Sequence, residues 1–152
     1  MSVAMTREER ESFLAEVHVG IIGIERKERA PLTVPIWYAY EPGGELWIVV
    51  ETDSVKERLL RRVGRFSLCA QSETPPYKFV SVEGPVVTFE SSVKERDEHA
   101  MAGRYLGDQL ADAYVKMTAA DPDNRPGVIV TMRPDRWFSY DGAKQWKSSS
   151  AS

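Results

Sequence analysis

The fold is decided by residues 31–62, which read PLTVPIWYAYEPGGELWIVVETDSVKERLLRR. Two stretches of this segment, Leu32–Tyr40 and Glu45–Thr52, are rich in the branched and aromatic residues typical of β-strands. Between them, Pro42-Gly43-Gly44 supplies the positive φ angles that a tight hairpin needs. Pro35 has no backbone N–H, so we expect its strand at the edge of a sheet or beside a ligand.

A capped helix is predicted directly after this hairpin. Ser54-Val-Lys-Glu57 has the capping-box arrangement, in which a hydroxyl and a carboxylate three residues later satisfy each other's backbone amides. We expect this helix to reach about Arg62. Its free amides and positive dipole end favour a phosphate or carboxylate, and Thr52 and Ser54 add hydroxyl donors while Lys56 adds a charge. An ordinary N-cap followed by a solvated basic face explains the same residues, so both interpretations stay open.

The remaining elements are predicted from hydrophobic periodicity and capping signals. We expect helices at Thr6–Glu16, Val93–Tyr105 and Asp108–Met117, and strands at His18–Ile24 (buried on both faces), Arg65–Gln71, Lys78–Glu90, Val128–Met132 and Trp137–Tyr140. Strands and helices do not alternate along the chain, which excludes a doubly wound nucleotide fold. About six or seven strands in so short a chain predict a mainly β protein that forms a small closed or split barrel. We predict one domain over residues 1–152, with about residues 1–5 and 147–152 flexible.

Composition excludes several classes of protein. The 152 residues carry 20 Lys and Arg against 23 Asp and Glu, a net charge of -3, which argues against nucleic acid as a partner. Neither a bilayer-spanning apolar run nor a signal peptide is apparent, so we expect a cytoplasmic protein that does not bind a membrane. With one cysteine, Cys69, and only His18 and His99, we expect no metal site. We predict that Cys69 is a core residue and that both histidines are structural.

Familiar catalytic motifs are absent as well. The sequence has no Gly-Lys-Ser/Thr phosphate loop, no Gly-x-Gly-x-x-Gly element and no Gly-x-Ser-x-Gly elbow. No nucleophile is apparent, so the catalytic residue is unknown and catalysis would have to come from a bound cofactor. Aromatic residues in or beside the predicted strands can fill the core or cover a flat ligand. These residues are Trp37, Tyr38, Tyr40, Trp47, Tyr77, Phe79, Trp137, Phe138 and Tyr140.

The order of several motifs resembles a known family. These motifs are Pro31-Leu-Thr-Val-Pro-Ile-Trp-Tyr38, Leu46–Thr52, Ser54-x-Lys56 followed by Leu59-Leu60, Gly64-Arg-Phe-Ser-Leu-Cys69 and Val82-Glu-Gly84. Together they resemble the pyridoxamine 5'-phosphate oxidase-like split-barrel proteins. Among these, they resemble the flavin/deazaflavin oxidoreductase branch of actinobacterial type, which uses coenzyme F420 or FMN. The similarity extends over about residues 13–137.

The resemblance implies which residues bind the cofactor. Thr52, Ser54 and Lys56 match the positions that hold its phosphate. The strand Val34–Trp37 matches the backbone that lies along the ring system, while Phe79 and Trp137 match ring contacts, the latter made across a dimer interface. The implied cofactor-binding residues are Val34, Pro35, Ile36, Trp37, Thr52, Ser54, Lys56, Phe79 and Trp137. Family members are commonly homodimers with two cofactor sites built from both subunits.

The resemblance also implies an activity, namely hydride transfer from reduced F420 to a small planar or conjugated organic substrate. We favour F420 over FMN because Arg58, Arg61 and Arg62 can attract its oligoglutamate tail. Val55 stands where an arginine commonly precedes the lysine, and an Arg-x-His type element is missing near the end, so pyridoxamine phosphate oxidase activity itself is not expected. Two alternatives stay open: an FMN-dependent oxidoreductase of the same fold, and a noncatalytic module that binds a flavin or another flat ligand.

Overall fold

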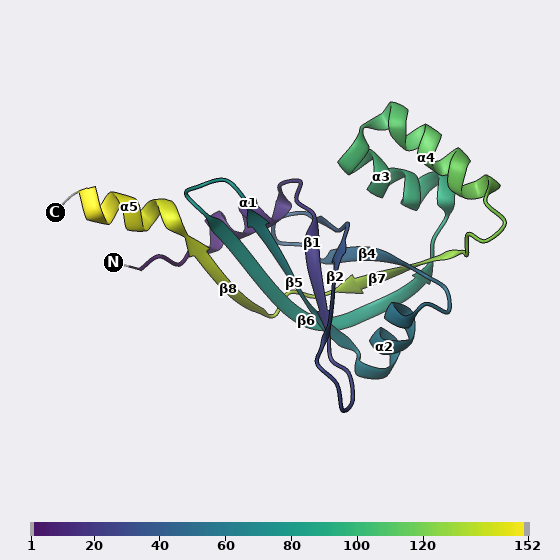
Figure 1. The fold of residues 1–152 in the computed structure, drawn as a ribbon, viewed down its shortest axis with the longest axis horizontal. Helices are drawn as coiled ribbons and strands as arrows, with labels where there is room; N and C mark the ends of the chain where they lie inside the picture. The colour runs from purple at the N-terminus through teal and green to yellow at the C-terminus, as the bar shows by residue number, and fades with distance from the viewer. Residues whose placement is uncertain (1, 151–152) are drawn as a thin grey trace.

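The computed structural model describes residues 2–150 as a curled antiparallel sheet surrounded by helices (Figure 1). The helices are α1 (Arg7–Ala15), α2 (Val55–Val63), α3 (His99–Leu106), α4 (Asp108–Ala120) and α5 (Gly142–Ser150), with a π-helical turn, η1 (Lys94–Glu98), before α3. The strands are β1 (Gly20–Ile24), β2 (Leu32–Ile36), β3 (Ala39–Tyr40), β4 (Leu46–Glu51), β5 (Arg65–Ser72), β6 (Lys78–Ser91), β7 (Gly127–Met132) and β8 (Arg136–Asp141). Within residues 2–150, no helix is long and apolar enough to cross a membrane.

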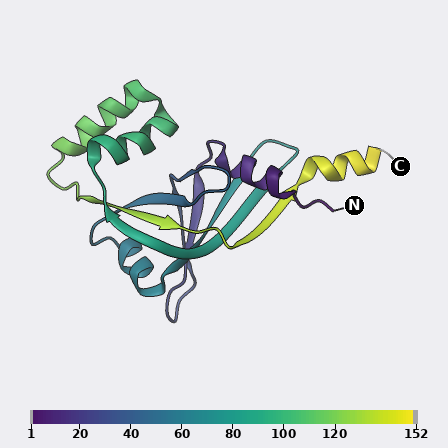
Figure 2. The same cartoon turned by 180° about the vertical axis from the view of Figure 1, so that it is seen from behind.

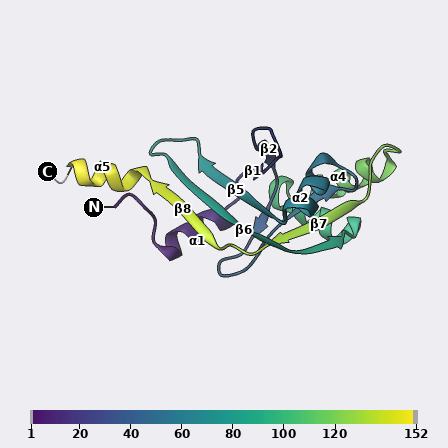
Figure 3. The same cartoon turned by 90° about the horizontal axis from the view of Figure 1, so that it is seen from below.

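Strand β6 organises the sheet because its two halves pair with different strands. Its first half pairs with β5 and β8, and its second half pairs with β7. The strand order is β2-β1-β5-β6-β7-β4-β3, with β8 on β6 outside this path. Figure 3 shows β6 running from beside β8 to beside β7. Because its register shifts between Val86 and Thr88, the strand bends there and the two halves of the sheet curl around a common core.

A glycine permits the chain to cross β6 at this bend. A Cβ at Gly84 would overlap the carbonyl oxygen of Arg133, so only glycine fits there. Arg133 lies in the turn between β7 and β8, and its N–H donates to the carbonyl oxygen of Pro85 (3.0 Å). Asp135 follows, with its N–H donating to the carbonyl oxygen of Glu83 (2.9 Å). The chain thereby passes from the second half of β6 back to the first.

The core lies inside the curl. Along β4, Leu46, Ile48 and Val50 are buried, while the side chains between them face the outer surface. Burying a side chain of this size contributes roughly 1.5–3 kcal/mol. Tyr38 is also fully buried, and its hydroxyl donates to the carbonyl oxygen of Leu14 in α1 (2.7 Å). Burial raises the pKa of Tyr38, so this hydroxyl stays protonated as a donor.

The strand predicted over residues 32–40 is two strands, so that prediction was wrong in part. β2 pairs with β1, with Val34 opposite Ile22, whereas β3 pairs with β4. Residues 37–38 carry the chain from one half of the sheet to the other, a change of partner that strand propensity does not reveal. The predicted turn is confirmed, since Gly43 has a φ of 80°. β2 is an edge strand, as Pro35 indicated.

Two further expectations differ from the structure. The strand predicted over residues 18–24 begins at Gly20 and is buried on one face only, since Ile21 is 40% exposed. The frayed tail predicted over residues 147–152 is helical as far as Ser150, at the end of α5. Residues 151 and 152, like residue 1, lie outside the described residues. The flexibility predicted for both ends stays a prediction.

Helices α3 and α4 form a hairpin that stands off the sheet at the end where β4 and β7 lie (Figure 2). Two residues of α3 attach this hairpin to the N-terminal half of the chain. The Arg104 guanidinium donates to the carbonyl oxygen of Glu16 (2.8 Å). The Tyr105 hydroxyl donates to the carbonyl oxygen of His18 (2.6 Å) and accepts from the N–H of Tyr38 (3.0 Å). The hairpin is therefore fixed over the link between β2 and β3.

The two ends of the described chain are joined by Lys144 of α5. Its ammonium group donates to the carbonyl oxygen of Ala4 (2.9 Å) and to Oε1 of Glu9 in α1 (2.7 Å). Glu9 also completes the capping box with Thr6 that the sequence predicted. Figure 1 shows α5 and the N-terminal segment side by side.

This contact predicts a pH dependence of stability. Hydrogen bonds from Lys144 and from the N–H of Thr6 lower the pKa of Glu9 to about 2, from an ordinary 4.5. Because the folded state favours the carboxylate, its stabilisation is complete above about pH 4.5 and is lost as the pH falls toward 2. We expect Glu9→Gln to lower the free energy of unfolding at about pH 6 but not near pH 2, measured by urea titration. An equal loss at both pH values would contradict the contact.

Candidate functional site

The junction between β4 and α2 is a tight corner. Asp53 adopts a left-handed φ of 62°, which aspartate tolerates better than most residues. Ser54 is the N-cap, and its Oγ accepts from the N–H of Glu57 (3.2 Å). The prediction of a full capping box was wrong, because Oε1 of Glu57 accepts from the N–H of Asp53 (2.8 Å) and not from that of Ser54. The N–H of Ser54 donates instead to the carbonyl oxygen of Glu51 (3.2 Å).

The predicted phosphate-binding residues meet at this corner, but they are not equally free. The Thr52 hydroxyl donates to the carbonyl oxygen of Pro126 (2.9 Å), so its hydrogen is already used. Ser54 accepts a hydrogen bond and keeps its own hydroxyl hydrogen for a ligand. Lys56, half-buried in the first turn of α2, makes no hydrogen bond or ion pair with any of residues 2–150. Together with the first amides of α2, these groups suit an anion.

The arginines after Lys56 differ in availability. Arg61 forms an ion pair with Glu57 (3.3 Å). Arg58 donates only to a backbone carbonyl, and Arg62 is exposed with no partner in the described part of the chain. Two of these three guanidinium groups therefore keep a positive charge that no carboxylate offsets, as the tail-binding prediction requires.

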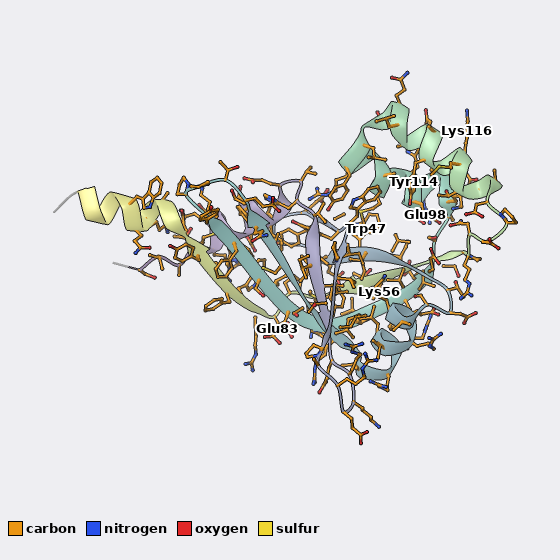
Figure 4. The ribbon with its side chains drawn as sticks, viewed as in Figure 1. Trp47, Lys56, Glu83, Glu98, Tyr114 and Lys116 are labelled. Carbon is orange, nitrogen blue, oxygen red and sulfur yellow. The ribbon has the colours of Figure 1, made fainter. Side chains whose placement is uncertain are left out.

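A cavity of about 200 Å³ opens beside this corner, between the α3–α4 hairpin and β4. Figure 4 shows Glu98 and Tyr114 on the side of the hairpin that faces β4, with Lys116 on its outer side. Arg125, at the cavity, donates to the carbonyl oxygen of Thr52 (3.4 Å) and so connects cavity and corner. The lining residues are Ile36, Trp37, Val49, Val50, Glu51, Glu98, Met101, Tyr114, Asn124, Arg125 and Gly127.

Aromatic stacking fixes one wall of the cavity. The ring of Trp37 stacks on Tyr105, with centroids 5.0 Å apart and planes 7° apart. Tyr114 from α4 meets the same indole at 5.7 Å and 48°. Because the Tyr105 hydroxyl is bonded to the backbone at His18 and Tyr38, the Trp37 ring has little freedom to move.

The remaining predicted residues of β2 lie near this wall but do not line the cavity. Val34 is half-buried and Pro35 is exposed. Both belong to the edge strand, whose outer side pairs with no other strand in residues 2–150. Of the predicted ring-binding strand, Ile36 and Trp37 line the cavity and the other two residues lie beyond it.

Phe79 and Trp137 lie away from the corner within one chain. Phe79 stands at the start of β6 and stacks on Tyr140 of β8, with centroids 5.9 Å apart. The cavity lies beyond the other end of β6. Trp137 packs edge-on against Tyr40 (6.0 Å) beneath the Arg10 guanidinium (4.8 Å). Phe79 and Trp137 were both predicted as contacts of the cofactor ring, and within one chain neither lines the cavity beside Trp37.

Cys69, His18 and His99 are surrounded by other parts of the fold and not by the cavity lining. Cys69 is only half-buried, on the face of β5 opposite to the buried Leu68, so the prediction of a core residue was wrong. Burial still raises the pKa of its thiol, which disfavours the reactive thiolate. His18 stacks on Phe13, with centroids 4.5 Å apart. His99 lies 2.7 Å from Oδ1 of Asp112 within the hairpin. None of the three lines the cavity beside the corner.

The sequence did not single out the cavity residues that come from the hairpin and its following loop. No motif assigned a site role to Met101, Tyr114, Glu98 or Arg125, all of which line the cavity. Their placement depends on contacts such as that between Tyr105 and Tyr38, which are 67 residues apart. No local motif encodes such a contact.

Comparisons with known proteins support the fold. No protein-family model and no curated protein matches the chain. Among solved structures, an F420 reductase is 21% identical, with a TM-score of 0.69 over 84% of this chain and 94% of that chain. Protein Rv2991 from Mycobacterium tuberculosis is 23% identical, with a TM-score of 0.73 over 94% and 89%. A Listeria innocua protein assigned as a pyridoxamine 5'-phosphate oxidase is 13% identical, with a TM-score of 0.63 over 88% and 96%.

These likenesses define the class of fold. The chain has the mainly β split-barrel fold of pyridoxamine 5'-phosphate oxidase-like proteins, as the order of its motifs indicated. At such low identities the likeness establishes the fold alone, and one fold can carry many activities. The corner and the cavity are therefore the features of this chain that bear on its function.

The corner predicts a specific loss of stability. Glu57 is 7% exposed, and it both accepts from Asp53 and pairs with Arg61. Glu57→Ala leaves the Asp53 N–H without its partner, so we expect a loss of about 1–3 kcal/mol in the free energy of unfolding, measured by urea denaturation. Glu57→Gln keeps an acceptor oxygen and should lose less. Equal losses in the two variants would mean that the hydrogen bond to Asp53 does not hold the corner.

Proposed function

We propose that this chain is an oxidoreductase that binds a flavin-type cofactor, with coenzyme F420 preferred to FMN. The observation that carries the proposal is the unpaired Lys56 beside the N-cap Ser54, next to a cavity lined by Ile36 and Trp37. An anion-binding corner beside an aromatic wall suits a molecule with a phosphate and a flat ring. The fold shared with an F420 reductase supports the same cofactor class.

In this proposal, Ser54 and Lys56 hold the cofactor phosphate. The Ser54 hydroxyl hydrogen and the first amides of α2 donate to its oxygens, and the ammonium group supplies the opposite charge. Thr52 has a different role, because its hydroxyl is bonded to the loop at Pro126. It holds this loop, and with it Arg125, against the end of β4.

The ring is proposed to lie along the outer edge of β2. The outer side of this strand pairs with no other described strand, so its backbone groups can bond the polar edge of a ring. Pro35 removes one donor from that row. When bound, a reduced deazaflavin or flavin supplies a hydride, and a conjugated acceptor takes it up together with a proton from solvent.

The preference for F420 rests on charge. Arg58 and Arg62 lie on the helix that begins at the proposed phosphate site, and neither is offset by a carboxylate among residues 2–150. The acidic tail of F420 gains from this field, whereas FMN ends at its phosphate. Since exposed charges are screened by salt, the tail's contribution to affinity should weaken as ionic strength rises.

A homodimer is part of the proposal, because Phe79 and Trp137 can contact a cofactor only if it belongs to a second copy. Phe138, beside Phe79 at 5.7 Å, is 70% exposed, as expected of an aromatic side chain that a partner covers. Sedimentation at micromolar concentration should give a dimer. A monomer would remove Phe79 and Trp137 from the proposed site.

Lys56→Ala tests the phosphate assignment. We expect the Kd for F420 to rise roughly tenfold or more, because a charge-assisted contact is lost, and the Kd for FMN to rise similarly. Lys116→Ala is the matched control, since this lysine is exposed on the outer side of the hairpin (Figure 4). Binding is followed by tryptophan and cofactor fluorescence at low and moderate salt. Unchanged affinity in Lys56→Ala would contradict the assignment.

Catalysis needs a separate measurement. The protein is loaded with reduced cofactor and mixed with each of a panel of quinone, enone and tetrapyrrole acceptors. Oxidation of the cofactor is followed under anaerobic conditions. Acceptor-dependent oxidation supports an oxidoreductase. Tight binding without oxidation by any acceptor would favour the noncatalytic module instead.

A further inference from the structure

The cavity under the hairpin is small for a cofactor with three fused rings. Its volume of about 200 Å³ is below the roughly 300–1,000 Å³ of ordinary ligand pockets. A flavin or deazaflavin has three fused rings, whereas a single substituted ring is a ligand of the smaller size that this cavity suits.

The walls of the cavity suit an aromatic ring. Trp37 and Tyr114 form one side, and Met101 adds a polarisable thioether. Val49 comes from the opposite wall, on the outward face of β4. Tyr105 stacks behind Trp37 and keeps the wall in place, so the shape exists before a ligand binds.

One of the polar groups that line the cavity, the Glu98 carboxylate, is an acceptor. The Glu98 side chain is only 16% exposed. Its Oε1 accepts from Lys94 (3.1 Å) and its Oε2 from Ser92 (2.9 Å). Each carboxylate oxygen has two acceptor positions, so one position on each remains for a ligand. A ring that enters this cavity therefore gains by presenting an O–H or N–H to Glu98.

We propose that the cavity binds a single aromatic or heteroaromatic ring whose O–H or N–H donates to Glu98. Its role as the substrate pocket rests on the proposed function, but the binding itself does not. The ring lies against Trp37 and Tyr114. Neither Ser54 nor Lys56 lines the cavity, and the proposed cofactor ring lies along the outer edge of β2, so this ligand and the cofactor bind together.

The first test compares phenol with toluene, which has the same number of heavy atoms but no donor. The indole N–H signal of Trp37 is assigned from the spectrum of Trp37→Phe and followed by ¹H–¹⁵N NMR during each titration. We expect saturable shifts, with phenol binding at least fivefold more tightly than toluene, and a smaller preference in Glu98→Gln. No shift with phenol, or toluene binding equally well, would overturn the proposal.

A second test fills the cavity. Val49→Phe should abolish phenol binding, whereas Val87→Phe on β6, outside the cavity, should leave it unchanged. The dispersed NMR spectrum of each variant reports whether it folds, and the comparison of phenol with toluene in the unmodified protein does not depend on either variant. Phenol binding to folded Val49→Phe with unchanged affinity would overturn the location.

The relation to the cofactor is tested in protein saturated with F420. Phenol should still shift the Trp37 signal, with its Kd within about twofold of that of the free protein. Competition between phenol and F420 would overturn the proposal, because it would place the cofactor in the cavity. A failure of F420 to bind at all would count against the proposed function alone, because phenol binding is measured without it.

Discussion

One strand, β6, forms hydrogen bonds with β5 and β8 along its first half and with β7 along its second, and the remaining structure depends on that division. It forces a bend near Gly84, where the turn after β7 passes against the strand. It also sends the chain beyond Ser91 into the α3–α4 hairpin and returns it at Gly127 beside the end of β4. The corner and the cavity are adjacent because β4 ends where β7 begins, with Glu51 opposite Gly127.

The two parts of the site are held by different forces. The corner is polar: a left-handed Asp53 and a buried Glu57 fix where α2 begins, and this leaves Lys56 uncompensated. The cavity wall is aromatic and depends on the Tyr105 hydroxyl, which attaches the hairpin to the link between β2 and β3. A charged position beside a rigid aromatic wall suits the phosphorylated cofactor and the planar ligand that we propose.

Local signals in the sequence predicted much of this. The Gly43 turn, the Ser54 N-cap and the long strand β6 follow from turn chemistry, capping and strand propensity, each of which acts over a few residues. The split of residues 32–40 into β2 and β3 did not follow, because it depends on which half of the sheet each part joins.

The same limit applies to the site. Thr52 reads as a hydroxyl donor in sequence, yet in the structure its hydrogen is bonded to Pro126, 74 residues away. Glu98 and Tyr114 reach the cavity only through the placement of the hairpin, which long-range contacts determine.

The most direct measurement is a crystal structure of the protein with bound F420. The phosphorus should lie at the start of α2, within hydrogen-bonding distance of the Ser54 hydroxyl and the Lys56 ammonium group. A phosphate bound elsewhere, with Lys56 in solvent, would contradict the proposed site.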